Sequence, residues 1–243
     1  MHIIKLNAID STNSYLRRRY LDKELEDFTV ATASEQTHGR GQMGTTWESE
    51  SGKNLTLSVF KKINCLAIDQ QFYVSMASSL AVLKTLKKMQ IHALSVKWPN
   101  DILSDNQKLC GVLIESIVRK QELDAIIVGI GLNVNQTYFS KGINASSLKN
   151  ITGMHYNIDE VLHDLLIEVK KYVVLLVENK LQQISDEYHN HLFRKDKPST
   201  FKDKKGNLIM GFIKGVSNTG RLQVLLEDEV MKEFDMKELQ LMY

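Results

Sequence analysis

The sequence predicts an α+β protein: a mixed or antiparallel sheet, helices packed on one side of it, and a small β-rich domain at the C-terminal end. Three observations lead to this fold class. Apolar, β-rich segments follow one another across short polar turns, most clearly at 109–117 and 125–134. One long stretch, 70–89, carries apolar residues at helical spacing. From residue 206 on, the chain contains short β-rich segments separated by turns.

Composition bounds the class of protein. The chain has 243 residues, of which 43% are hydrophobic and 25% charged, so it can bury a substantial core. Its 31 basic and 29 acidic residues leave a net charge of +2, which does not favour nucleic acid as a partner. Cys65 and Cys110 are too few for a disulfide framework. The sequence shows no signal peptide and no apolar run of membrane-spanning length, so we expect a cytoplasmic location.

The first strand is expected at 3–9, followed by a polar turn in which Ser11 can cap a helix over 13–21. A plain helix cap is one interpretation of this turn. The other is functional, because exposed N–H groups and hydroxyls at a helix start can hold a small polar ring. The next strands are expected at 28–34 and at 54–60, where apolar and polar residues alternate.

Between these two strands lies a polar loop over 36–46 that contains three glycines and Arg40. Glycine lets a backbone approach a ligand closely, and arginine offers a planar fork for a carboxylate or phosphate. Trp47 can anchor the loop by burying its ring. We expect the loop to be mobile when empty and to order over a ligand; a flexible surface loop is the alternative.

The stretch 97–111 carries the strongest charge pattern. Pro99 ends a strand, because proline has no N–H for a ladder, and two polar turns follow. Lys97 and Lys108 are therefore expected at the facing ends of two antiparallel strands, with Asp101 between them. Cations around a carboxylate suit a nucleotide with Mg²⁺, whereas the alternative is a solvated hairpin.

The strand at 125–134 contains glycines at 129 and 131, which often mark close approach of a ligand to the backbone. It is not a dinucleotide-binding fingerprint, since the third glycine and the following helix are missing. A loop is expected at 137–148. Asn157 and Glu160 then form a capping box that begins a helix.

A second helix is expected at 181–192, and a domain boundary at 195–198. The chain is thus divided into a catalytic domain, 1–194, and a small β-barrel domain, 195–243. The strands expected in the second domain are 206–216, 221–227, 231–235 and 239–242.

Four stretches resemble the motifs of biotin protein ligases, in family order. These stretches are 10–13, 36–47, 97–101 together with 108–111, and 129–133. Each is weak alone, whereas four in order are specific. The resemblance covers roughly residues 1–180 well and the C-terminal tail more loosely. It implies the class II synthetase-like fold of biotin and lipoate ligases, a C-terminal SH3-like β-barrel, and a form without an N-terminal DNA-binding domain.

The resemblance also implies roles for individual residues. Lys108, Arg40 and Lys97 would be catalytic: Lys108 would bind the biotin carboxylate and then the acyl and phosphate oxygens, and the other two would hold phosphates. Asp101 would be the ligand of Mg²⁺. Biotin would be bound by Ser11, Thr12, Asn13, Gln36, Arg40, Gly41, Gln42, Lys108, Gly111, Leu113, Gly129 and Gly131. ATP and the adenylate would be bound by Arg40, Trp47, Lys97, Asn100, Asp101, Lys108 and Asn133.

The activity implied is that of a biotin–protein ligase, with ATP, Mg²⁺ and biotin as substrates or activator and no tightly bound prosthetic group. The expected partner is a biotin carboxyl carrier domain of a carboxylase, and a homodimer is one expected assembly. Neither DNA nor membrane is expected as a partner. The first motif begins at Asp10, which leaves no room for a helix-turn-helix.

A lipoate–protein ligase and a non-catalytic binding module are the alternatives to this function. A lipoate–protein ligase has a similar fold and chemistry, but it does not share the full set of motifs. A binding module without catalysis is disfavoured by Lys108. Cys110 could serve as an acyl-transfer nucleophile, although it stands in an apolar run where a small residue would do. The histidines show no metal-ligand spacing.

Two departures from the family pattern stand out. Gln42 occupies a position where the family often has arginine, so the glycine loop carries a single cation. Small residues over 144–148 stand where the family often has a bulky apolar residue that closes over the adenylate. The first departure predicts faster release of the adenylate, with an equally good fit of glutamine as the alternative. The second puts the closing role of this segment in doubt.

Overall fold

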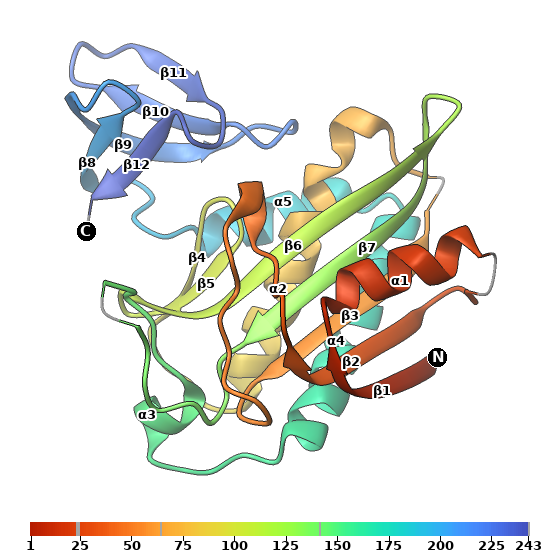
Figure 1. Ribbon diagram of the computed structural model, residues 1–243. Coiled ribbons are helices and arrows are strands. Elements are labelled where there is room, and N and C mark those ends of the chain that lie inside the picture. The colour runs from red at the N-terminus through yellow and green to blue at the C-terminus, as the bar shows by residue number, and fades with distance from the viewer. Residues whose placement is uncertain (23–24, 64, 141, 243) are drawn as a thin grey trace.

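The computed structural model describes residues 1–22, 25–63, 65–140 and 142–242. It contains a seven-stranded sheet in the order β1-β2-β3-β7-β6-β5-β4 and a five-stranded sheet in the order β11-β10-β9-β8-β12 (Figure 1). The first sheet is mixed, because β1 and β2 run parallel and every other neighbouring pair is antiparallel. The expected α+β class with a mixed sheet is confirmed.

The bounds of the elements follow the predicted pattern closely. The helices are α1 (Thr12–Leu21), α2 (Phe72–Lys88), α3 (Leu148–Thr152), α4 (Ile158–Val177) and α5 (Leu181–Asn190). The strands of the large sheet are β1 (His2–Ile9), β2 (Thr29–Gln36), β3 (Leu55–Lys62), β4 (Leu94–Lys97), β5 (Asp101–Ser104), β6 (Gln107–Arg119) and β7 (Glu122–Leu132). Those of the small sheet are β8 (Pro198–Asp203), β9 (Leu208–Val216), β10 (Leu222–Leu226), β11 (Met231–Phe234) and β12 (Leu239–Met242).

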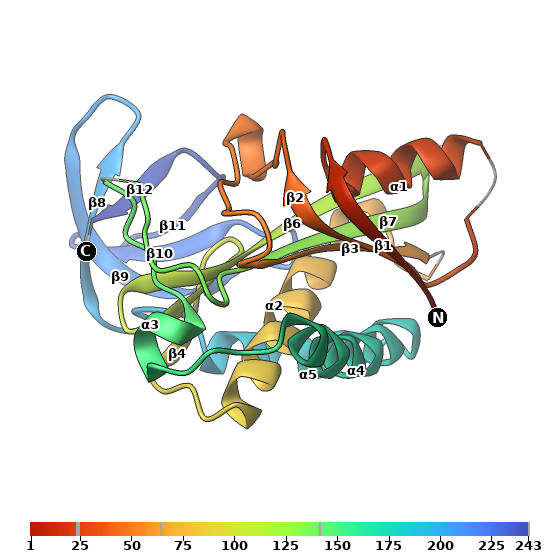
Figure 2. The ribbon, with the colours of Figure 1, turned by 60° about the horizontal axis from the view of Figure 1, so that its bottom comes forward.

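The large sheet carries helices on both faces, which corrects the expectation of one covered face (Figure 2). α2, α4 and α5 lie on one side, and α1 lies on the other. Strand alternation explains the division: Val59 joins the core beneath α2, whereas its neighbour Phe60 packs with Leu16 of α1. α1 must cross a face because it connects the parallel strands β1 and β2.

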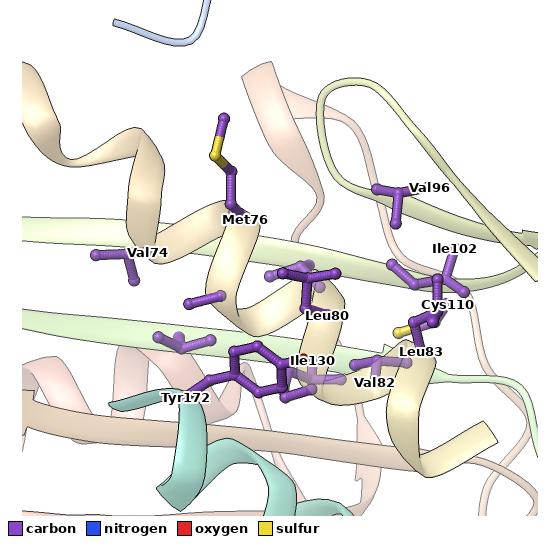
Figure 3. Close-up of a cluster of buried hydrophobic side chains, with 14 of the residues drawn as sticks. Val74, Met76, Leu80, Val82, Leu83, Val96, Ile102, Cys110, Ile130 and Tyr172 are labelled. Carbon is purple, nitrogen blue, oxygen red and sulfur yellow. The ribbon is translucent and has the colours of Figure 1, made fainter. Parts of the chain in front are cut away.

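The main apolar core fills the space between α2 and the sheet (Figure 3). α2 is buried along most of its length, since α4 and α5 cover the side that faces away from the sheet. The predicted stripe of Phe72, Met76, Leu80 and Leu83 is buried as expected. No helix in the described part of the chain is long and apolar enough to cross a membrane.

Three elements were missed. β5 lies between β4 and β6, so Lys97 and Lys108 do not end two strands that pair with each other. α3 follows the loop at 137–148, and β8 precedes the predicted strands of the small sheet. All three are short: α3 has five residues, β5 four and β8 six, and β8 begins at a proline. Elements of this length carry too few residues for a periodic signal.

The small sheet docks onto the large domain through the turn between β9 and β10. The indole Nε1 of Trp98 donates to the carbonyl of Gly220 at 2.9 Å, and the Tyr73 hydroxyl donates to Asn218 Oδ1 at 2.8 Å. A side chain at Gly220 would overlap the ring of Phe72. These contacts hold the small sheet beside the segment between β4 and β5.

Candidate active site

A cavity of about 510 Å³ opens on the α1 face of the large sheet and extends to the small sheet. All of the site residues expected from the sequence line this cavity, with the exception of Asn133. Strand alternation brings them to one face, since Gly111, Leu113, Gly129 and Gly131 occupy alternate positions on β6 and β7. The small sheet contributes further lining residues, among them Met236, Lys237 and Gln240.

One end of the cavity lies at the start of α1 and is built from neutral polar groups. Gln36 Oε1 accepts from the backbone N–H of Thr12 at 2.8 Å and from its hydroxyl at 3.1 Å. The Ser58 hydroxyl lies 2.7 Å from that of Thr12 and donates to Asn13 Oδ1. Thr12, Asn13 and Ser58 are at most 3% exposed. We call this set, with Gln36, the neutral end.

Ser11 is the N-cap residue of α1, but its side chain makes no capping hydrogen bond. The first free N–H of the helix, that of Thr12, is instead satisfied by Gln36 from β2. The plain helix-cap interpretation of Ser11 is therefore wrong. Its side chain lines the cavity.

The glycine loop is a tight backbone turn. Gly41 N–H donates to the Thr45 carbonyl at 2.7 Å, and Trp47 N–H donates to the Gly39 carbonyl at 3.0 Å. A Cβ at Gly39 would overlap the Trp47 carbonyl, and one at Gly41 would overlap the Thr45 hydroxyl. Two of the loop glycines are thus required by the close approach of the loop to itself.

Trp47 lies deeper in the cavity than a loop anchor would. Its indole covers Gly131 and reaches Gly111, where a Cβ at either position would meet the ring. The Lys108 ammonium lies 5.5 Å from the ring centroid. The indole Nε1 is buried and has no hydrogen-bond partner among the described residues.

The other end of the cavity is charged. Lys97 of β4 pairs in register with Asp101 of β5, and Asp101 in turn pairs with Gly111 of β6. A bulge between Ile102 and the next residue shifts this register, and the Lys108 ammonium forms a 2.7 Å ion pair with Asp101. We call Lys97, Asp101 and Lys108 the charged end.

The backbone of Lys108 is clamped by the segment at 144–146. Its N–H donates to the Asn144 carbonyl, and its carbonyl accepts from Ser146 N–H, both at 3.0 Å. Asn133 completes the clamp, because its buried amide donates to the carbonyls of Lys108 and Ser146. Asn133 is not among the residues that line the cavity, and it braces the site from its place just past the end of β7.

Asn100 lines the cavity as expected, but its amide nitrogen donates to the backbone carbonyl of Val112. The backbone of Val112 donates to the Asn100 carbonyl at 3.0 Å in return. Asn100 therefore ties the turn before β5 to β6. This tie holds Asp101 beside Lys108.

Arg40 differs from the expectation. Its guanidinium lies 3.0 Å from the carboxylate of Glu115, near Ser14 of α1, and so sits at the neutral end. Glu115 and Ser58 were both missed from the sequence. The signal was available for each, since Glu115 continues the alternation of Gly111 and Leu113, and Ser58 lies on the polar face of β3.

Cys110 is no nucleophile in this structure. It is fully buried and points into the core beneath α2 (Figure 3). Burial raises the pKa of its thiol far above the usual range. The described residues also contain no cluster of three or more histidine, cysteine or acidic side chains able to hold a metal ion.

The arrangement joins two kinds of recognition in one cavity. The neutral end can satisfy a small polar group through hydrogen bonds, and the charged end can neutralise phosphate or carboxylate oxygens. Asp101 is a lone carboxylate there. It fits a Mg²⁺ ion that arrives with a nucleotide, because such ions are bound by one or two carboxylates plus phosphate oxygens and water.

Comparisons with known proteins agree with this geometry. The biotin/lipoate A/B protein ligase family matches residues 6–133. A bifunctional ligase/repressor of Escherichia coli is 27% identical over 237 residues, which cover 93% of this chain and 70% of that protein. The equivalent Bacillus subtilis protein is 27% identical over 135 residues, only 41% of its length. A biotin–[acetyl-CoA-carboxylase] ligase of Mycobacterium tuberculosis is 26% identical over 215 residues, 87% of this chain and 79% of that one.

Among solved structures, a biotin protein ligase from Aquifex aeolicus in complex with biotin and ATP superposes with a TM-score of 0.82. It is 27% identical and covers 99% of this chain and 98% of its own. The similarity thus extends over both sheets.

Proposed function

This chain belongs to the biotin/lipoate A/B protein ligase family, and we propose that it is an ATP-dependent biotin–protein ligase. It would activate biotin as biotinyl-5′-AMP and transfer the biotinyl group to a lysine of a biotin carboxyl carrier domain. The observation that carries the proposal is the joining of a neutral, hydrogen-bonded end and a cationic end in one cavity. A biotin molecule requires both ends at once, because it has a neutral ureido ring and a carboxylate.

In the first step, a carboxylate oxygen of biotin attacks the α-phosphorus of ATP. The new acyl–phosphate bond forms as the bond to the pyrophosphate group breaks, and pyrophosphate leaves. Negative charge gathers on the α-phosphate oxygens, and preorganised cations stabilise it. Lys108 and Lys97 have this role at the charged end. Asp101 would be the protein ligand of a Mg²⁺ ion bound with ATP, which would supply positive charge to the leaving phosphates.

Asp101 holds Lys108 until the substrates arrive. The 2.7 Å ion pair between them neutralises both groups in a partly buried site. A Mg²⁺ ion bound with ATP would compete with Lys108 for this carboxylate, which would leave the ammonium available to the biotin carboxylate. The pair therefore couples nucleotide binding to the freeing of the catalytic lysine.

In the second step, the neutral amine of the carrier lysine attacks the acyl carbon of the adenylate. AMP leaves, an amide bond forms, and the amine releases its proton to solvent. Lys108 stabilises the acyl oxygen as it gains negative charge. Its backbone clamp holds the base of this side chain in place beside Gly111.

Arg40 has a different role from the one expected from the sequence. Its guanidinium is paired at the neutral end, so it closes the glycine loop over the biotin ring, while Lys97 and Lys108 serve the phosphate. Trp47 supplies the flat apolar surface between the two ends.

A lipoate ligase is the alternative within the same family. A dithiolane ring offers no strong hydrogen-bond donors or acceptors to the amide and hydroxyl groups of the neutral end, whereas a ureido ring offers both. The neutral end thus favours a ureido ring. Incubation with MgATP and either biotin or lipoate, followed by mass spectrometry, tests this choice. Lipoyl-AMP in place of biotinyl-AMP would refute the proposal.

We also propose the domain organisation and the assembly of the chain. The expected domains are 1–194 and 195–243, with the five strands of the second closing as an SH3-like barrel. A homodimer in the cytoplasm is the expected assembly. The balanced charge favours no sequence-specific DNA binding. A tight, sequence-dependent gel shift at physiological salt would contradict that expectation.

A further inference from the structure

Glu115 is a partly buried carboxylate next to the cavity, and the proposed chemistry does not use it. It lies on β6, two residues beyond Leu113 on the same face of the sheet, and its side chain is 13% exposed. Its two oxygens have separate partners. Oε1 lies 3.0 Å from Arg40 Nη1, and Oε2 accepts from Asn13 Nδ2 at 2.9 Å. Both partners line the cavity, whereas Glu115 is not among its lining residues.

A carboxylate can only accept hydrogen bonds, so Glu115 decides which way the Asn13 carboxamide faces. The NH₂ group must point to Glu115, which turns Oδ1 towards Ser58 and above Gly129. The Ser58 hydroxyl can donate its one proton to this Oδ1 or to the hydroxyl of Thr12, which itself donates to Gln36. The charge on Glu115 thus decides that Asn13 presents an acceptor, and not a donor, to Ser58.

The same carboxylate holds the glycine loop. Arg40 is the cation of that loop, and its guanidinium is half-exposed except where it meets Glu115. Through this contact, β6 ties the loop to α1 and to the neutral end. The loop is therefore held at its Arg40 end without any phosphate present.

We propose that Glu115 is a positioning residue for ligand recognition in this site. Its charge orients Asn13, and it anchors the glycine loop through Arg40. The first of these roles rests on the proposed function, because it is expressed as affinity for biotin. The second role is a property of the protein without ligand.

The first experiment measures biotin binding by calorimetry for Glu115→Gln. With a glutamine, the amide oxygen can serve Arg40, but its NH₂ group then faces the NH₂ group of Asn13 unless Asn13 flips. We expect biotin affinity to fall at least tenfold, with kcat at saturating substrates within threefold of wild type. The matched control is Glu187→Gln, since Glu187 is also a partly buried carboxylate with one lysine and one hydroxyl partner, on α5. The control should bind biotin as wild type does, and the two variants should lose similar thermal stability.

A second substitution separates orientation from mere packing. In Glu115→Gln combined with Asn13→Asp, the new carboxylate at position 13 accepts from the glutamine amide and from Ser58, which restores the original direction. We expect the double variant to bind biotin at least fivefold more tightly than Glu115→Gln alone. Asn13→Asp alone, which sets two carboxylates face to face, should bind most weakly. Additive losses in the double variant, or a Glu115→Gln protein that binds biotin within twofold of wild type, would overturn the orienting role.

Hydrogen exchange in the ligand-free protein tests the anchoring role. We expect faster exchange over 39–47 in Glu115→Ala than in Glu115→Gln, and faster in both than in wild type or Glu187→Gln. Unchanged exchange in both Glu115 variants would refute the anchor. If wild type itself failed to bind biotin, the proposed function would fall, and this ligand-free measurement would still decide the role of Glu115.

Discussion

The neutral end and the charged end of the cavity are built on opposite principles. At the neutral end, Thr12, Asn13 and Ser58 are almost wholly buried, and each polar group is engaged with another part of the protein. At the charged end, the side chains of Lys108 and Asp101 are 31% and 20% exposed, and they neutralise each other. The neutral end is buried, and its side chains are held in place by hydrogen bonds to one another. The charged end is partly exposed, and its two opposite charges form an ion pair that a charged ligand can replace.

The difference follows from what each end has to bind. A neutral ring gains little from any single contact, so its site must be ordered before binding, when few rotamers remain to be frozen. Phosphate and carboxylate groups bring their own charge and can displace an internal ion pair. We therefore expect substitutions at the neutral end to change affinity, and substitutions at the charged end to change rate or nucleotide dependence.

The largest effect is expected at the charged end. Lys108→Ala should lose most adenylate formation, because an interaction made mainly in the transition state is worth about 2–4 kcal/mol, or roughly 30- to 1,000-fold in rate. Biotin-dependent exchange of pyrophosphate into ATP measures it. Lys214→Ala, which removes an exposed lysine paired with Asp196, is the control and should leave the rate unchanged. If the Lys108 variant formed the adenylate at the wild-type rate, the catalytic role assigned to Lys108 would be wrong.

Gly129→Ala tests the rigidity of the neutral end. The added Cβ would overlap the Asn13 carboxamide, and overpacking of this kind costs about 1–3 kcal/mol. We expect biotin affinity to fall by roughly 5- to 150-fold, with little change in the KM for ATP. Gly131→Ala is the companion variant, because its Cβ would meet the Trp47 indole instead. If both variants changed the affinity for biotin and the KM for ATP to the same extent, the two ends of the cavity would not act separately.

Asp101→Asn tests whether the ion pair between Asp101 and Lys108 is coupled to nucleotide binding. Asparagine keeps the shape of the side chain but binds Mg²⁺ and Lys108 without charge. We expect the KM for MgATP to rise about tenfold, equivalent to roughly 1.4 kcal/mol, and biotin binding to stay within about twofold. Titration of the initial rate with Mg²⁺ should show a matching shift. A large loss of biotin affinity would show instead that the two ends act as one unit.

The smallest effect concerns the glycine loop, where Gln42 lines the cavity. Glutamine donates a neutral hydrogen bond, worth about 1 kcal/mol, against about 1.5–3 for a bond to a charged group. We expect Gln42→Arg to release biotinyl-AMP about three- to tenfold more slowly, or roughly 0.7–1.4 kcal/mol. Stopped-flow dissociation of the adenylate from both proteins decides it. If the arginine variant released biotinyl-AMP at the same rate or faster, Gln42 would not weaken retention of the adenylate.

The sequence by itself determined the elements that have a period or a strong local rule. Repeating apolar residues predicted α2 and the central strands, and the charge pattern around Pro99 predicted the charged end of the cavity. Nearly every site residue that the motifs predicted lines the cavity, whereas the lining residues from the small sheet were not predicted. These properties are local, because they depend on residues close together in the chain.

Only the tertiary structure decided how the polar groups are paired. Glu115 reads as one more residue of an apolar strand, Ser58 as part of a solvent-facing alternation, and Arg40 as a phosphate ligand. The fold brings the three together from β6, β3 and the glycine loop, with Asn13 of α1 between them. Hydrogen bonds and ion pairs depend on distance and direction between segments far apart in sequence, and on burial that removes water as a competitor. None of these quantities is present in the order of residues alone, which is why the partners of the site emerged only from the folded chain.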